Sequence, residues 1–296
     1  MSRFAINEGF LQQVEQLQLI IKDNVAGMFG GEHKSKSFGS SCEFTDYREY
    51  NPGDDITKID WNAYARFDEL YLKLYLDERQ LHTRIYIDLS KSMDFNNSEK
   101  ANKALEIAAT IAYLSIMEMD KVSIYYIKND KVYDLITNMV GKEAYYNEIG
   151  KLNDLEFDGD CKISEAILPS KVGFGDGMSV IISDFLTDNN YEEAIDYLVE
   201  KKRDVLCMQV LSKEELRPTI TGKVHLFDNE DNEVYYRKNV TREIMKAYKE
   251  ALNYTINRIK GFCEARNQSY ALVEAEKSIS SIFLMKLPEL GVIKWS

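Results

Sequence analysis

Residues 83–93 read Thr-Arg-Ile-Tyr-Ile-Asp-Leu-Ser-Lys-Ser-Met. The first part, Arg84 to Leu89, is rich in β-branched and aromatic residues, which is typical of a buried strand in a parallel sheet. Asp88, Ser90 and Ser92 follow in alternation, and residues two apart in extended backbone project to the same side. The stretch therefore predicts a buried strand that ends in a carboxylate and two hydroxyls.

This all-oxygen donor set carries one negative charge and suits a hard divalent cation such as Mg2+, with Mn2+ as the alternative. A purely structural interpretation is also open. In that interpretation Ser92 or Asp94 caps a helix that starts near Ser98, and Asp88 lies in a surface turn. Because Asp-x-Ser-x-Ser occurs often by chance, the stretch alone does not decide between them.

The composition indicates a folded protein that binds neither nucleic acid nor an anionic membrane. The chain has 296 residues with 45% hydrophobic content, enough for a large α/β domain and a smaller appendage. Its net charge is −12 and its pI is near 4.9, so phosphate backbones and anionic lipid surfaces would be repelled on average. A protein partner with a basic surface is favoured.

No export signal or membrane span is evident. Met1 to Phe10 lacks a cationic start followed by an apolar core, and no long apolar run occurs, so we expect a cytoplasmic protein. Cys42, Cys161, Cys207 and Cys263 show no Cys-x-x-Cys spacing. This spacing argues against a zinc site and fits reduced thiols.

Before residue 83 the pattern predicts a helix followed by short β-structure. Apolar residues at helical spacing form one stripe, and the Asn-Pro-Gly-Asp-Asp segment is a turn signal. The expected elements are a helix over 8–25 with its stripe at Phe10, Val14, Leu17 and Ile21, a loop over 27–41, a strand over 43–50, a turn over 51–55 and a strand over 70–76.

After residue 93, helical and strand patterns alternate, which implies a mostly parallel sheet with helices on both faces. The expected elements are a helix over 99–119, a hairpin of 122–127 and 131–136, helices over 142–152 and 163–170, a strand over 178–182 ending in Ser183-Asp184, a helix over 191–201, a strand over 204–211, a helix over 241–266, a strand over 269–273 and a helix over 278–287. A further hairpin, 222–227 with 233–237, is expected to pair with the strand over 70–76. We therefore divide the chain into an N-terminal part, 1–80, joined by the hairpin segment 217–237, and a main domain, 81–290.

This order of elements, with Asp-x-Ser-x-Ser after the first strand, resembles the von Willebrand factor type A fold. The resemblance implies a sheet of order 3-2-1-4-5-6 with strand three antiparallel, and a metal-ion-dependent adhesion site. The first and fourth strands are then neighbours, so Asp184 arrives beside Asp88, Ser90 and Ser92 at the topological switch point. The structural interpretation does not account for this convergence.

A third loop of such sites normally contributes a threonine. The best match is Gly159-Asp-Cys-Lys-Ile163, which places Cys161 where the threonine would stand. A thiol is a poor ligand for Mg2+. This departure weakens the expected metal binding and favours a softer divalent ion or an empty site.

A longer string of motifs precedes the main domain and resembles the bacterial domain-of-unknown-function family 58. The motifs are Gly31-Glu-His33-Lys-Ser35, Gly39, Glu43-Phe44, Arg48-Glu-Tyr50, Pro52-Gly-Asp-Asp55, Ile59-Asp-Trp61 and Ala65-Arg66, with Lys100 and Leu226-Phe-Asp228 later. The resemblance implies a von Willebrand type A fold and an association with MoxR-type AAA+ ATPases. The charged residues of the string, Arg48, Asp54, Asp55, Asp60 and Arg66, predict an ion-pair network that fixes the appendage, or alternatively a docking surface for the ATPase.

Enzyme motifs are missing from the sequence. It has no phosphate-binding Gly-x-x-x-x-Gly-Lys-Ser/Thr loop, no dinucleotide fingerprint, no His-Glu-x-x-His and no Gly-x-Ser-x-Gly, and His33, His82 and His225 are isolated. We expect a non-catalytic adaptor that works with a MoxR-type ATPase and receives a carboxylate of an acidic client at its metal. The alternative is a metal-dependent hydrolase that uses Asp88 and Asp184, although no general base is visible.

Overall fold

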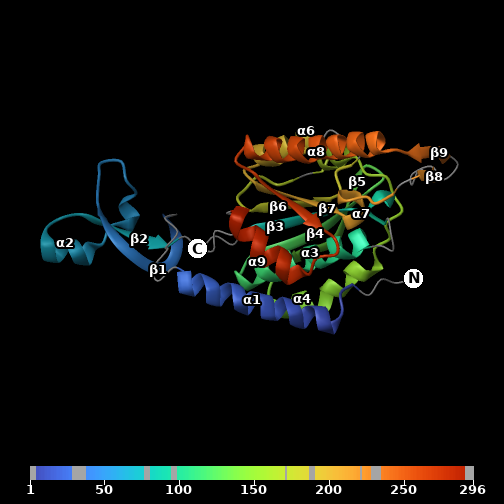
Figure 1. Cartoon of the computed structure of the whole chain (residues 1–296). Coiled ribbons are helices and arrows are strands. Elements are labelled where there is room, and N and C mark those ends of the chain that lie inside the picture. The colour runs from blue at the N-terminus through green and yellow to red at the C-terminus, as the bar shows by residue number, and fades with distance from the viewer. Residues whose placement is uncertain are drawn as a thin grey trace. The chain divides into compact units, whose positions relative to one another are not determined.

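The computed structural model describes residues 5–28, 38–76, 81–94, 99–170, 172–186, 191–220, 222–227 and 235–290. Its largest feature is a six-stranded sheet of order β10-β7-β6-β3-β4-β5 (Figure 1). The strands are β3 (His82–Asp88), β4 (Lys121–Lys128), β5 (Lys131–Met139), β6 (Met178–Ser183), β7 (Asp204–Leu211) and β10 (Ser269–Glu274). All neighbours are parallel except β5, which is antiparallel to β4. The predicted order and direction of the strands are confirmed.

The hairpin between β4 and β5 turns at Asn129 and Asp130. Both have positive φ, 51° and 57°, as a tight hairpin turn requires, and Asn and Asp tolerate this conformation better than most residues. The turn also supports the neighbouring loop, because Asn129 N–H donates to the carbonyl of Asp160 at 2.7 Å and Lys162 N–H donates to the Asp130 carboxylate at 2.8 Å.

Helices cover both faces of the sheet, as the alternating pattern predicted. Figure 1 shows α6 and α8 on one face and α3 and α9 on the other. The helices of this part are α3 (Glu99–Met117), α4 (Lys142–Glu148), α5 (Ile163–Ile167), α6 (Tyr191–Glu200), α7 (Lys213–Leu216), α8 (Arg242–Glu264) and α9 (Ile279–Leu290). Small side chains let α3 approach the sheet, since Ala101, Ala104 and Ala108 are fully buried.

The N-terminal helix α1 (Glu8–Met28) packs through the predicted stripe. Phe10, Val14 and Leu17 are buried. Asn153 fixes the entry to the helix, because its amide group bonds both the N–H and the carbonyl of Ile6. The helix begins at the predicted residue and ends three residues after the predicted end.

The chain divides into two compact units, one formed by Met1–Asp23 with Leu81–Lys294 and one mainly by Asn24–Gln80. The second unit pairs β1 (Phe38–Glu49) with β2 (Tyr71–Leu76) and adds a 3-10 turn (Ile56–Lys58) and α2 (Trp61–Phe67). The predicted turn at 51–55 is present, with Gly53 at φ 107°. The loop expected over 27–41 is wrong at both ends, because 27–28 belong to α1 and 38–41 belong to β1, and 29–37 lie outside the described residues.

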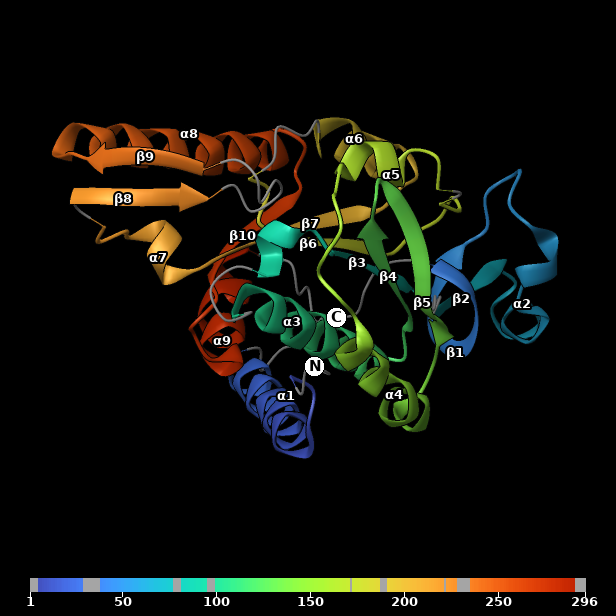
Figure 2. The same ribbon diagram turned by 90° about the vertical axis from the view of Figure 1, so that its right-hand side faces the viewer.

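The predicted partner of the strand over 70–76 is also wrong. This strand, β2, pairs with β1, whereas β8 (Gly222–Phe227) and β9 (Tyr235–Val240) pair with each other. Hydrogen bonding between β2 and β1 is local in sequence and leaves the hairpin in the first unit. The hairpin and the first half of α8 extend beyond the sheet (Figure 2).

No helix in the described part of the chain has the length and apolar character that a membrane crossing requires.

Candidate functional site

The candidate site lies where β3 and β6 end side by side. The two strands are parallel neighbours, with Ile87 opposite Ile182, and β4 continues the sheet on the other side of β3. Asp88 is the last residue of β3 and Asp184 directly follows β6. The structure thus brings these two carboxylates to one edge of the sheet, at its topological switch point.

Asp88 is a buried residue with a hydrogen bond to each carboxylate oxygen. One carboxylate oxygen, Oδ1, accepts from Ser90 N–H at 2.8 Å, and the other, Oδ2, accepts from Ser183 Oγ–H at 2.6 Å. Only 3% of Asp88 is exposed. The alternative that placed Asp88 in a surface turn is therefore wrong, while residues 95–98, on which the helix-cap alternative depends, lie outside the described residues.

The environment of Asp88 disfavours its charged form. Burial and the negative charge of Asp184 raise the pKa of Asp88 to about 6, against the opposing effect of the hydrogen bonds from Ser183 and Ser90. Among the described residues, no cationic side chain forms an ion pair with Asp88. The charged form of such a carboxylate would be stabilised by a cation that approached from outside the protein.

The hydroxyls of Ser90 and Ser92 complete one side of the site. Ser90 is buried and Ser92 is half-buried, and their Oγ atoms are 3.0 Å apart. Neighbouring ligands of an octahedral Mg2+ at about 2.1 Å are separated by about 3 Å, so the hydroxyl spacing fits such an ion. It also fits a hydrogen bond between the two hydroxyls.

Cys161 reaches the site on the predicted third loop. The loop runs beside the end of β3, because Gly159 N–H donates to the Leu89 carbonyl at 3.1 Å and Lys91 N–H donates to the Gly159 carbonyl at 2.9 Å. Gly159 is needed there, since a Cβ would lie 2.6 Å from the side chain of Lys128. Burial and the negative charge of Asp88 raise the pKa of the Cys161 thiol, so it stays protonated at neutral pH.

Asp184 is paired with a lysine that the sequence did not assign to the site. Lys100 Nζ lies 2.9 Å from Asp184 Oδ2 and 2.7 Å from Glu215 Oε1, and Lys100 is completely buried. Burial lowers the pKa of Lys100, but Asp184 and Glu215 outweigh it and the pKa lies above its ordinary value. The ammonium is therefore charged at neutral pH.

Further polar residues hold this arrangement in place. Ser212 and Glu215 form a reciprocal cap at the start of α7, which orients Glu215 toward Lys100. Gln209 donates to the Asp184 carbonyl at 2.7 Å and accepts from Tyr270 Oη–H at 2.6 Å. The sequence held a signal for Gln209, which interrupts the otherwise apolar segment 205–211, but none for Lys100, whose neighbours are Ser98, Glu99 and Asn102.

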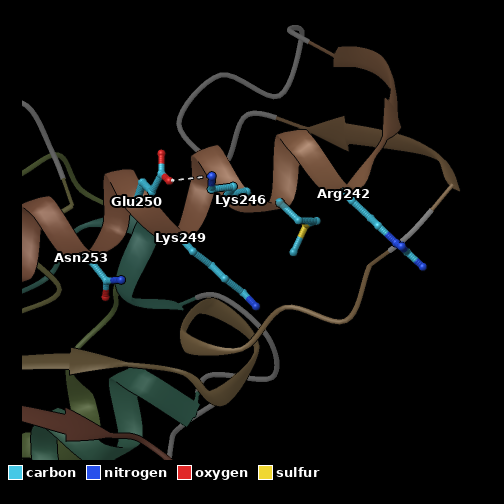
Figure 3. Close-up of a pocket in the computed structure, with 6 residues that line it drawn as sticks. Arg242, Lys246, Lys249, Glu250 and Asn253 are labelled. Carbon is cyan, nitrogen blue, oxygen red and sulfur yellow. Dashed lines mark ion pairs between the residues drawn. The ribbon is translucent and has the colours of Figure 1, made fainter.

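A second surface feature is a shallow pocket of about 390 Å³ along the projecting part of α8 (Figure 3). It is lined by Arg242, Met245, Lys246, Lys249, Glu250 and Asn253. Lys246 is paired with Glu250 at 3.7 Å, which leaves the pocket with a positive balance in an acidic protein. Tyr248 of the same helix donates to the Glu215 carbonyl at 3.0 Å, so α8 is linked to the Lys100 ion pair.

The charges of the second unit form local contacts. Arg48 pairs with Asp54 at 2.8 Å, and Asp60 caps α2 while it accepts from Tyr47 Oη–H at 2.8 Å and pairs with Lys73 at 3.3 Å. Hydrogen bonding from Tyr47 lowers the pKa of Asp60. Arg66 is exposed and pairs with no described residue, so the predicted network is present in part, with Lys73 as a further member that pairs with Asp60.

The hydrolase alternative gains no histidine or serine from the described residues. His82 is at the amino end of β3, the opposite edge of the sheet from Asp88. The side chains of the other two histidines, His33 and His225, lie outside the described part of the chain. Ser183 donates a hydrogen bond to Asp88, but only 1% of it is exposed, so its hydroxyl cannot reach a substrate from solvent.

Three comparisons place the chain among known proteins. Residues 46–256 match the protein family described as "Protein of unknown function DUF58". Uncharacterized proteins of Mycobacterium bovis and of two strains of Mycobacterium tuberculosis are each 26% identical over 227 residues, which cover 74% of this chain and 70% of the relative.

Two solved structures are partly similar. One is an aerotolerance-related membrane protein from Bacteroides fragilis, with a TM-score of 0.36 and 12% identity over 71% of this chain and 98% of the other. The second is the VWA domain of SpRpn10, with a TM-score of 0.38 and 11% identity over 70% and 94%. The strand order itself assigns the fold as a mostly parallel six-stranded α/β sheet flanked by helices.

Proposed function

The chain belongs to the family of proteins of unknown function DUF58, and we propose that it is a non-catalytic adaptor that binds another protein at the edge where β3 and β6 end. The observation that carries the proposal is the setting of Asp88. This buried carboxylate has an elevated pKa, lies beside two hydroxyls, and has no described ion pair. Carboxylates with raised pKa values are found often at functional sites, and the two hydroxyls beside Asp88 distinguish it from a merely buried carboxylate.

A divalent cation fits part of the predicted ligand set. Asp88, Ser90 and Ser92 would hold it, and Mg2+ or Mn2+ is the chemical class that an oxygen set of this kind selects. When bound, it would supply a positive charge that receives a carboxylate of the partner. Cys161 brings a neutral thiol in place of a hard oxygen, which favours weak binding.

The partner that we propose is a MoxR-type AAA+ ATPase, with an acidic protein as the client that the pair assembles or remodels. The family motifs around Arg48 and Asp60 support the ATPase. The positive balance of the α8 pocket supports an acidic client, because Arg242 and Lys249 are the kind of side chain that attracts carboxylates. Tyr248 links this helix to Glu215, so both surfaces belong to one region of the first unit.

The experiment is affinity capture from the native cell with three baits, in the presence and absence of a chelator. The baits are the wild type, Asp88→Asn and Asp120→Asn. Asp120 is a matched control, because burial also raises its pKa to about 6 and its carboxylate accepts from Leu81 N–H at the opposite edge of the sheet. The proposal predicts that a MoxR-type ATPase or an acidic client is retained by the wild type and by Asp120→Asn, and is lost with Asp88→Asn or chelator.

Retention of the same proteins by all three baits, with and without chelator, would contradict the proposal. The alternative function, a metal-dependent hydrolase, would have to use a carboxylate as its base, because the described histidine, His82, lies at the opposite edge of the sheet.

A further inference from the structure

The ion pair of Lys100 divides the candidate site into two parts. In the first part, Lys100 Nζ lies between Asp184 and Glu215 at 2.9 and 2.7 Å. In the second part, Asp88, Ser90 and Ser92 have hydrogen bonds but no ammonium among the described residues. A cation that enters from solvent therefore meets two carboxylates that differ in what they already bind.

Both oxygens of Asp184 are engaged. Oδ2 faces Lys100, and Oδ1 accepts from Leu186 N–H at 3.1 Å. The Asp184 carbonyl is fixed by Gln209, so the backbone cannot easily turn the carboxylate toward another ion. To use Asp184, a divalent cation would have to displace an ammonium that has no exposed surface, or lie close to its positive charge.

Lys100 itself has little freedom to leave. It lies on a buried stripe of α3 with Ala104, Ile107 and Ile111, so the aliphatic part of its side chain is packed. Its ammonium contacts the carboxylates of Asp184 and Glu215. Glu215 is oriented by its reciprocal bonds with Ser212. A buried lysine with two carboxylate partners is costly to separate from either of them.

We infer that Lys100 is a built-in cation that holds Asp184 permanently, so that an added divalent cation binds only at Asp88, Ser90 and Ser92. This inference rests on the proposed function and specifies the ligands of its cation site. The site is then a three-oxygen site of low affinity that favours an ion able to keep several of its waters, which is the behaviour of Mg2+. Removal of the ammonium should convert it to a two-carboxylate site of higher affinity.

The test is isothermal calorimetry with Mn2+ and Mg2+ on purified full-length protein. The affinity of Asp184→Asn for the metal should stay within about threefold of the wild-type affinity, whereas Asp88→Asn should bind the metal at least about tenfold more weakly. Lys100→Met should bind at least about tenfold more tightly, because Asp184 is left with an unmet charge. Lys103→Met is the matched control, since Lys103 is also buried on α3 but is paired with Glu106, and it should change nothing.

A second measurement needs no variant and covers the case in which Lys100→Met does not fold. The ammonium signal of Lys100 is followed by nitrogen-15 NMR, where a buried, paired ammonium exchanges its protons slowly. Addition of Mg2+ should leave the chemical shift and the intensity of this signal unchanged. Its loss on addition of Mg2+ would show that the metal displaces Lys100 from Asp184 and would overturn the inference.

Two calorimetric results would also overturn the inference. One is a loss of metal affinity in Asp184→Asn as large as the loss in Asp88→Asn. The other is a folded Lys100→Met variant that binds the metal no more tightly than the wild type. These readouts do not involve a partner protein. If they come out as expected while no partner is captured, the proposed function fails and the assignment of Lys100 stands.

Discussion

At the scale of single residues, the site is defined by what each carboxylate already contacts. Asp184 has a buried ammonium at 2.9 Å, whereas Asp88 accepts hydrogen bonds from neutral groups, among them the Ser90 N–H and the Ser183 hydroxyl, and has no ion pair with a described residue. Hydrogen bonds stabilise a buried carboxylate only in part, so Asp88 keeps an elevated pKa. The residue with the unmet charge is therefore the one at which we expect a ligand.

Cys161 sets the strength of cation binding in this account. Cys161→Thr should raise the affinity for Mg2+ by about tenfold, because a hard hydroxyl replaces the neutral thiol beside Asp88. Cys161→Val is the control, since valine has nearly the shape of threonine and lacks the oxygen. Calorimetry on the three proteins decides the matter, and equal affinities for the threonine and valine variants would show that position 161 does not reach the cation.

His82 gives the protein a dependence of stability on pH. Burial, followed by the positive charges of Arg84, Lys121 and Arg203, lowers the pKa of His82 to about 4 from an ordinary value near 6.5. Between these values the unfolded chain binds more protons than the folded chain, so the free energy of unfolding falls as pH falls through this window.

His82→Gln should remove that part of the dependence while it keeps a hydrogen bond to Ser123. Thermal unfolding of both proteins at about pH 7.5 and about pH 5 measures the effect, and the wild type should lose more stability than the variant. Asp120, whose raised pKa has the opposite sign of effect, is present in both proteins and cancels in the difference. A difference that stays constant with pH would contradict the assignment.

At the scale of elements, the strands and long helices could be predicted because their apolar period is long and regular. β7 was predicted to the residue and α3 to within two residues. The short elements were missed: α2 and α7 have seven and four residues and depend on their caps, Asp60 and Ser212, rather than on an apolar stripe. Pairing of β2 with β1 was missed because β1 has a long irregular register with bulges.

The sequence predicted which residues of the two strand ends come together at the candidate site, but it did not predict the contacts that Asp184 makes there. Position along the strands brought Asp88, Ser90, Ser92 and Asp184 together, because alternation and strand order are readable from the sequence. Burial of Lys100 beside Asp184 depends on how α3 and α7 pack, and nothing local to position 100 fixes it.

The second unit depends on Asp60 more than on Arg66. Asp60→Ala should lower its unfolding temperature, because α2 loses its N-cap and Tyr47 and Lys73 lose their acceptor. Arg66→Ala should change it little, since Arg66 is exposed without a described ion pair. Thermal unfolding with hydrogen exchange over residues 61–67 compares the two, and a larger loss with Arg66→Ala would contradict this role of Asp60.

At the scale of the whole molecule, the described residues form two compact units, and the candidate site at Asp88 lies in the first one. The charge of the chain is −12, while the α8 pocket near that site has a positive balance. Under the proposed function, the α8 pocket would attract an acidic partner while the rest of the surface repels acidic proteins, which favours specific over general binding.

Catalysis by the chain alone is not expected. The purified protein should hydrolyse no nucleoside triphosphate, because its sequence has no loop that can cradle a triphosphate. Phosphate release measured with and without Mg2+ checks this expectation. Turnover that survives repurification and disappears with Asp88→Asn would favour the hydrolase alternative.

The most direct test of the central claim is the affinity of the purified protein for the MoxR-type ATPase of the same cell, measured by calorimetry or biolayer interferometry in Mg2+. We predict that Asp88→Asn weakens binding by at least about tenfold, as loss of a charge-assisted contact would, and that Asp120→Asn stays within about threefold of the wild type. Equal affinities of all three proteins would contradict the claim that the edge at Asp88 binds the partner.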